Sequence, residues 1–217
     1  MARRARGLTL SEMLVTLAVV SVIALAVAGV AVALSAADAA ADTYRESIRT
    51  AHAALARISR LVRSSILIPS ADSQRLVLWT GDDNGNGAIN LGELAVLSWD
   101  EGEEKLLVRE IVFDESWQYW YCNPTFSLSQ LVSASAVEQM LSGSQYCQTS
   151  LLASDVTGFE LQVSPAPPLS TTVTVKLTVG QTSGTITVNS GATLRAPRVS
   201  NVLITMDGEC YLENGSH

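Results

Sequence analysis

A twelve-residue segment, Asp82–Glu93, holds the residues whose types and spacing are best suited to chemistry. Oxygen-bearing side chains recur at every second position of its first half, and a glutamate closes it. A hard cation binds six to eight oxygens at about 2.3–2.6 Å, and this spacing would wrap oxygens around one point. The expected ligands are Asp82, Asn84, Asn86, the backbone carbonyl of Ala88, Asn90 and Glu93.

The spacing of this segment matches the calcium loop of an EF-hand, with Gly87 at the sharp turn. Its flanks alternate in polarity, which predicts a loop inside a β-hairpin rather than between two helices. One copy with few charged ligands predicts a modest calcium affinity, about 10⁻⁴ to 10⁻³ M. The alternative is a hairpin turn rich in Asn and Gly that binds no metal.

Glu12 lies at the edge of an apolar run, which is an unusual place for a charged side chain. Residues 13–34 carry no charge, which corresponds to roughly 33 Å of helix and is enough to cross a bilayer. Arg3, Arg4 and Arg6 precede the run. Since basic residues stay on the cytoplasmic side, we expect a cytoplasmic N-terminus and an exported C-terminal domain.

Three interpretations of this N-terminus compete. A conventional secretory signal would be cleaved at the small residues before Asp38, but its apolar core usually spans only about 7–15 residues. A plain membrane anchor would leave Glu12 as an incidental interfacial residue. The third interpretation is a prepilin leader, which accounts for the glycine, the glutamate and the retained apolar run together.

The stretch from Gly7 to Val15 resembles the N-terminal signal of type IV pilins and type II secretion pseudopilins. The resemblance implies cleavage by the prepilin peptidase between Gly7 and Leu8, methylation of the new N-terminus, and retention of the apolar helix in the bacterial inner membrane. An inner-membrane assembly platform would then incorporate the subunit into a fibre. Leu8 and Ser11 depart from the residues that the family prefers.

The expected role of Glu12 is assembly. A lone carboxylate in hydrocarbon costs about 2.5–3.5 kcal/mol on insertion scales, so it needs a partner. Cleavage creates a positive amine on Leu8, and Glu12 of one chain can neutralise the Leu8 amine of its neighbour. This pairing would set the axial register of stacked subunits.

The helical pattern continues beyond the membrane. Apolar residues recur at spacings of three and four up to Ile66, and Pro69 is a stop signal, so we predict one helix from Leu8 to Ile66. The apolar stripe consists of Tyr44, Ile48, Ala51, Leu55, Ile58, Val62 and Ile66. The expected organisation is a leader at 1–7, an assembly half at 8–34, an amphipathic half at 35–68 and a β-rich head at 69–217.

The predicted fold class is α+β, with an antiparallel sheet packed on the helix stripe. Period-two alternation marks strands in RLVLW, ELAVLSWD, EKLLVREIVF, GFELQV, TTVTVKLTV and GTITVNS. A short helix is expected within Ser127–Leu141. Cys122 and Cys147 would lie in an oxidising compartment and are the favoured disulfide, although Cys210 could pair with either.

The charge balance limits the functions that the chain could have. The net charge is −7, and no basic stripe remains in the head to neutralise nucleic-acid phosphates. No nucleophile elbow, phosphate-binding glycine loop or zinc spacing occurs, so we expect no enzyme. The function expected is a minor pseudopilin of a type II secretion system. The alternatives are a minor type IV pilin of an adhesion or DNA-uptake pilus, and a secreted calcium-binding domain.

Overall fold

The structure is a computed structural model that describes residues 9–115, 123–181 and 184–194, with the backbone of 202–204 and 210–212. It comprises two compact units, Met1–Glu46 (unit 1) and Ser47–His217 (unit 2). Unit 2, the head, starts earlier than the predicted limit at residue 69 because it includes the amphipathic part of the N-terminal helix.

Unit 1 is helical from Leu10 onward, as part of helix α1 (Leu10–Ser64). Thr9 precedes the helix, and Glu12 lies in its first turn, where a carboxylate interacts favourably with the positive end of the helix dipole. The prediction of one long helix is confirmed over the described residues, while Leu8 lies outside them.

The amphipathic part of α1 ends in the head. Its buried residues are Ala51, Ala54, Leu55, Ile58 and Val62, which confirms the predicted stripe at four of these positions and adds Ala54. Tyr44, in unit 1, is exposed, so the stripe begins later than predicted. The helix stops at Ser64, and strand β1 (Leu67–Ala71) already contains Pro69. The amphipathic half is therefore shorter than the predicted limit at residue 68.

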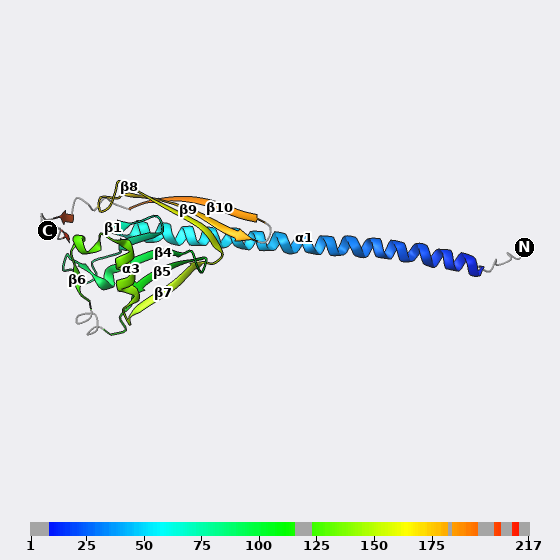
Figure 1. Ribbon diagram of the computed structural model, residues 1–217, viewed down its shortest axis with the longest axis horizontal. Coiled ribbons are helices and arrows are strands. Elements are labelled where there is room, and N and C mark those ends of the chain that lie inside the picture. The colour runs from blue at the N-terminus through cyan, green and yellow to red at the C-terminus, as the bar shows by residue number, and fades with distance from the viewer. Residues whose placement is uncertain (1–8, 116–122, 182–183, 195–201, 205–209, 213–217) are drawn as a thin grey trace, which may run out of the picture. The chain divides into compact units, whose positions relative to one another are not determined.

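A five-stranded antiparallel sheet forms the centre of the head (Figure 1). Its strand order is β1-β2-β4-β5-β7, with β1 at one edge, which is where a proline such as Pro69 is tolerated. The other strands are β2 (Arg75–Trp79), β4 (Leu94–Asp100), β5 (Lys105–Ile111) and β7 (Cys147–Ala153).

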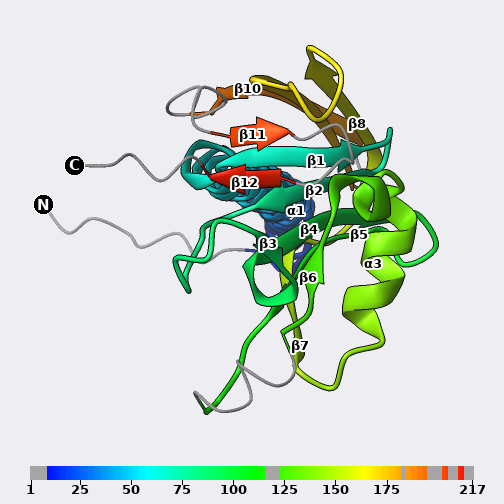
Figure 2. The same ribbon diagram turned by 90° about the vertical axis from the view of Figure 1, so that its left-hand side faces the viewer.

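Both faces of this sheet are buried. Leu76 and Leu78 belong to the cluster around α1, whereas the intervening Val77 and the next residue, Trp79, belong to a second cluster. Because successive side chains of a strand point to opposite faces, one strand supplies both cores. The second cluster includes residues of helix α3 (Ala134–Ser142) and of the 3-10 turn η2 (Leu128–Leu131). Figure 2 shows α3 beside the five-stranded sheet.

The helix predicted within Ser127–Leu141 is thus present but interrupted. Ser133 has an extended backbone, and its hydroxyl accepts from the Ala136 N–H, so it caps α3 and separates it from η2. Capping by serine is favoured because its side-chain oxygen satisfies an N–H that has no partner within the helix.

A second, three-stranded sheet packs on the stripe of α1. Its order is β10-β9-β8, and its strands are β8 (Val156–Ser164), β9 (Thr172–Gln181) and β10 (Gly184–Thr193). Inward side chains such as Val175 and Leu177 join the α1 cluster. The predicted α+β class is correct, but the strands divide between two sheets rather than forming one. Two short pairs complete the fold, β3 (Ile89–Asn90) with β6 (Thr125–Phe126), and β11 (Val202–Ile204) with β12 (Cys210–Leu212).

A charged cluster attaches α3 to the five-stranded sheet. Glu138 on α3 accepts hydrogen bonds from Arg75 of β2 and Arg109 of β5, and all three side chains are at most 28% exposed. The hydrogen bond and the charge of Glu138 raise the pKa of Arg75 above its ordinary value. Charge-assisted bonds of this kind fix the position of the helix on the sheet.

Candidate functional site

The first candidate site is the start of α1. The Thr9 N–H and its hydroxyl both donate to Glu12 Oε2, at 2.9 and 3.0 Å, and the Glu12 N–H donates back to Thr9 Oγ1 at 3.4 Å. This reciprocal arrangement is a capping box, which satisfies orphan N–H groups at a helix start. Gly7 and Leu8, the predicted processing site, lie outside the described residues.

This geometry shows what the carboxylate of Glu12 can do. In the single chain it reaches back toward the N-terminal side and accepts two hydrogen bonds at one oxygen, Oε2. An ionised carboxylate has about four lone-pair sites on its two oxygens, so it can accept from a further donor. The sequence T-x-x-E at residues 9–12 is the local signal for this capping box. The role of Glu12 in assembly stays a prediction.

The second feature of unit 1 is its apolar surface. The large apolar side chains from Met13 to Leu34 are 53–74% exposed. Among the described residues, α1 is the one helix that is long and apolar enough to cross a membrane, with a mean hydropathy of 2.8 over its most apolar window. Such a surface is stable in lipid or against other apolar helices, and not in water.

The second candidate site is the loop at residues 82–93, between β2 and β4. These two strands pair with each other in antiparallel register, from Arg75↔Ser98 to Trp79↔Leu94, so the loop does belong to a β-hairpin. Gly85 and Gly87 have φ values of 68° and 74°. This left-handed conformation favours glycine, and at Gly87 it forms the sharp turn that the sequence predicted.

Two carboxylates hold the ends of the loop. Asp82 accepts from the Asn86 and Gly87 N–H groups at 3.1 and 3.0 Å. Glu93 is fully buried, and its oxygens accept from the Trp79 indole N–H at 3.0 Å and the Asp83 N–H at 3.2 Å. Glu93 thereby connects the last position of the loop to its beginning.

Three asparagines converge inside the loop. Asn90 Oδ1 accepts from the side-chain amides of Asn84 and Asn86, both at 2.9 Å. The Asn90 amide also donates to the Asn123 carbonyl and to the Thr125 hydroxyl, at 3.3 and 3.2 Å. The loop is therefore tied to the segment that contains β6, which the sequence did not suggest.

The loop contains the oxygen-bearing residue types that a hard cation prefers. In this structure those oxygens accept hydrogen bonds within the loop, and the amide N–H groups of Asn84 and Asn86 point to Asn90 Oδ1. Asp82, Asn84, Asn86, Asn90 and Glu93 all take part in one connected group of hydrogen bonds or flank it directly. The described residues hold no group of three His, Cys, Asp or Glu side chains placed to bind a metal. A cation here would therefore depend on the asparagine amides and on the Ala88 carbonyl, and carbonyl oxygens are ligands that Ca²⁺ accepts.

The predicted disulfide remains a prediction. Cys147 starts β7 and is a free thiol in the structure, partly buried beside the second core cluster. Its expected partner Cys122 lies outside the described residues, and only the backbone of Cys210, in β12, is described.

Comparison with known proteins bears on the N-terminus. Residues 2–28 match the family model described as the prokaryotic N-terminal methylation motif. The match contains the whole stretch from Gly7 to Glu12 and more than half of the uncharged run. No curated protein matches the chain. With this motif running into one long apolar helix, which continues into a head of antiparallel sheets, the chain is a type IV pilin-like protein.

Proposed function

We propose that the chain is a minor pseudopilin, a structural subunit of a type II secretion pseudopilus and not an enzyme. The observation that carries the proposal is the exposed apolar surface of Met13–Leu34, directly after the methylation motif. A helix whose apolar side chains all lack internal partners needs lipid before assembly and neighbouring helices afterwards. A chain of 217 residues is longer than a compact major subunit, which favours a minor one.

The proposed assembly mechanism depends on Glu12. The peptidase would cut between Gly7 and Leu8, and the new amine would belong to the residue directly before Thr9, whose N–H already donates to Glu12. The carboxylate of one subunit would attract the Leu8 amine of the next and offset its own cost in the membrane. The Leu8 amine of the neighbour would either replace the hydrogen bonds that Glu12 accepts from Thr9 or add to them.

The proposed topology places the N-terminus in the cytoplasm and the head in the periplasm. Three arginines precede the apolar run and Asp38 and Asp42 follow it, in agreement with the positive-inside rule. In this orientation the prepilin peptidase reaches Gly7 on the cytoplasmic side. The cysteines of the head would enter the oxidising compartment, where a disulfide can persist.

The replacement Glu12→Ala tests this function. We expect cleavage and methylation to continue, because the scissile bond is unchanged, and incorporation into fibres to be lost. The matched control is Ser11→Ala, which removes a neighbouring polar group and keeps the carboxylate. Sheared fibres and membranes would be separated and each probed for the head. Normal amounts of the Glu12→Ala chain in fibres would contradict the proposal.

A minor pilin of an adhesion or DNA-uptake pilus is the second candidate, since the same motif and helix serve both systems. Genes of a secretion apparatus next to this one would favour the pseudopilin. DNA binding by the head would favour the uptake pilus, although the net charge of −7 disfavours it. A secreted calcium-binding domain would require removal of the apolar helix.

We further propose that the loop at residues 82–93 binds calcium through Asp82, Asn84, Asn86, Ala88, Asn90 and Glu93. Support comes from the spacing of the oxygen-bearing residues and from the buried carboxylate of Glu93. A cation would have to replace the hydrogen bonds that the Asn84 and Asn86 amides donate to Asn90 Oδ1. Calcium would supply positive charge and add ligand bonds to a loop that is otherwise held by hydrogen bonds. Its role is to brace the head, because β2 and β4 on either side belong to both cores.

Calcium titration of the melting temperature tests the metal site. At about 1 mM Ca²⁺ and a dissociation constant of about 10⁻⁴ M, mass action adds roughly 1.4 kcal/mol to the stability of the head. The variant Asp82→Ala should abolish the shift. The matched control Asp114→Ala removes a carboxylate outside the loop and should keep it. An unchanged melting temperature of the original chain in millimolar calcium would contradict calcium binding by this loop.

A further inference from the structure

Strand β10 is an edge of the three-stranded sheet, and the register shows which of its backbone groups point outward. The Leu194 N–H, directly after the strand, donates to the Thr171 carbonyl at 2.9 Å. In an antiparallel pair, residues that bond to the neighbouring strand alternate with residues that do not. Every second residue before Leu194 therefore bonds to β9, and the residues between them direct N–H and C=O to the open edge. These open-edge residues are Thr185, Thr187, Asn189, Gly191 and Thr193.

The open edge of β10 lacks the irregularities of the other edge strands. Strand β1 contains Pro69 and a bulge, and the pairings of β7 and β8 also shift in register. Bulges and prolines keep a sheet edge from pairing with another chain. Strand β10 has ten continuous pairs with β9 and no proline or charged side chain. Among the described strands none pairs with its other side, so the edge can accept a further strand.

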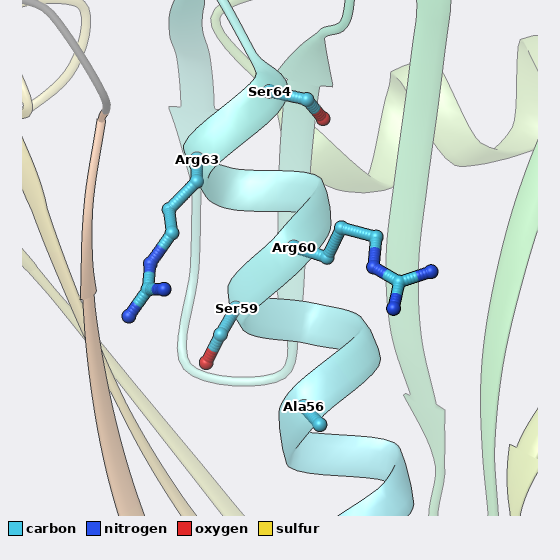
Figure 3. Close-up of a pocket in the computed structure, with 5 residues that line it drawn as sticks. All are labelled: Ala56, Ser59, Arg60, Arg63 and Ser64. Carbon is cyan, nitrogen blue, oxygen red and sulfur yellow. The ribbon is translucent and has the colours of Figure 1, made fainter.

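A groove on α1 lies directly beyond this edge. It has a volume of about 640 Å³ and is lined by Ala56, Ser59, Arg60, Arg63 and Ser64. The Ser59 hydroxyl lies 3.4 Å from the Ser190 hydroxyl of β10, so Ser59 is on the side of the helix that β10 covers. Figure 3 shows Ser59 and Arg63 directed to one side of α1 and Arg60 to the other.

The helical geometry orders the groove residues around α1. Each residue advances by about 100°, so Arg63, Ala56 and Arg60 follow Ser59 by about 40°, 60° and 100°, away from the buried Ile58. Neighbouring strands of a sheet lie about 4.8 Å apart. A strand added to β10 would therefore lie over the groove, and the small side chains of Ala56 and Ser59 would leave room for its inward side chains.

The charge of the groove indicates the chemistry of this strand. Arg60 and Arg63 are exposed, and no carboxylate of the described residues forms an ion pair with either. After Ser64 the sequence contains six basic and seventeen acidic side chains, so the two arginines are a positive site on a mainly acidic head. Complementary charges select the partner and the register of an interface.

A second copy of β10 does not supply that complement. Residues 184–193 contain no carboxylate, so pairing two copies through β10 would leave the arginines of both without a partner. An acidic strand from another protein satisfies the backbone groups of the edge and the guanidinium groups of the groove together.

We propose that β10 accepts an extended segment of a different protein as a fourth strand, with carboxylates at alternate positions directed to Arg60 and Arg63. Its backbone would bond to the open-edge residues, and its inward side chains would fill the groove. In such strand addition the backbone bonds supply affinity and the side-chain sites supply specificity. The inference concerns the head alone and does not depend on the assembly of α1 into a fibre.

Peptide binding to the full-length chain in detergent tests the proposal. The probe is a fluorescent peptide of five Thr-Glu repeats, and its matched control has five Thr-Lys repeats. Fluorescence anisotropy at physiological ionic strength should show about tenfold tighter binding of the acidic peptide. With the acidic peptide bound, amide exchange should slow at the open-edge residues, because only a paired strand protects alternate N–H groups.

A backbone variant tests the edge. Asn189→Pro removes an N–H that points to the open edge and keeps the bonds of β10 to β9, a position where an edge strand tolerates proline. We expect it to weaken binding of the acidic peptide about tenfold, since the added strand loses a bond and meets the proline ring. The matched control Asn189→Ala keeps the N–H and should bind as the original chain does. Equal melting temperatures of the two variants show that the fold is kept.

A charge variant tests the groove. Arg63→Gln should weaken binding of the acidic peptide and leave the exchange of the free chain unchanged. The matched control Arg57→Gln removes an exposed arginine of the same helix that does not line the groove, and should bind normally. Equal effects of the two substitutions would contradict the assigned contact with the groove.

The remaining outcomes also decide the proposal. Failure of the acidic peptide to bind, or equal binding of both peptides, would overturn an acidic partner. Full binding to Asn189→Pro would mean an anion site on the arginines without strand addition. A dimer of the original chain that Asn189→Pro dissociates would mean that β10 pairs with a second copy. Open-edge amides that exchange slowly before any peptide is added would mean that another part of the chain covers the edge. Each of these results would overturn the fourth strand and leave the proposed pseudopilin function intact.

Discussion

The first half of α1 and the head bury their apolar side chains in opposite ways. Met13–Leu34 exposes them all, whereas in the head Leu76 to Trp79 bury four consecutive side chains in two different cores. The described part of the head builds two apolar cores within one chain, whereas the apolar helix needs lipid or other apolar helices. Stability of the head and assembly of the fibre should therefore respond to different substitutions.

The largest expected effect comes from the same substitution made in both regions. Leu78 is 1% exposed and Leu25 is 74% exposed. Leu78→Ala should lower the unfolding free energy of the head by about 2–5 kcal/mol, because it removes contacts and leaves a cavity. Leu25→Ala should leave it unchanged. Urea unfolding in detergent, followed by tryptophan fluorescence, measures the unfolding free energy of both variants. Equal losses of unfolding free energy would contradict the difference between the two regions.

A smaller effect is expected from the polar groups of the head. Glu138→Gln removes the charge that two arginines share beneath α3 and should cost about 1–3 kcal/mol. The control Glu160→Gln acts on a pair with Lys176 that is 63% exposed at the glutamate, and should cost under about 1 kcal/mol. If thermal unfolding showed the same loss of stability for both variants, burial of the Glu138 cluster would contribute nothing to the stability of the head.

The smallest effects are expected at the two helix caps. Ser133→Ala removes the cap of α3 and should lower the stability of the head by about 1 kcal/mol. Thr9→Ala removes the capping box of α1 and should speed amide exchange only in its first turn, with head stability unaffected. Hydrogen exchange resolved by residue distinguishes the two, and a destabilised head in Thr9→Ala would contradict the separation of the regions.

Much of the fold follows from periodicity in the sequence. The apolar run and the stripe from Ala51 to Val62 predict α1, and alternation predicts β2, β4, β5, β8, β9 and β10. Strand β1 was missed because Pro69 is also a helix stop signal, and only its place at the sheet edge makes it tolerable. The division into two sheets depends on which strands pair, and local alternation carries no such information.

The candidate sites were predictable to different degrees. Spacing alone located the loop at residues 82–93 and the turn at Gly87, since ligand positions in such a loop are local in sequence. The contacts of Asn90 with Asn123 and Thr125 join segments more than thirty residues apart, and those of Glu138 with Arg75 and Arg109 are similarly distant. Only tertiary packing brings these groups together.

The intact mass of the chain purified from assembled fibres shows whether the apolar helix is kept after processing. We expect a polypeptide that begins at Leu8, carries one methyl group on its amine and retains the whole of α1. A mass that corresponds to a start near Asp38, without the apolar helix, would contradict it.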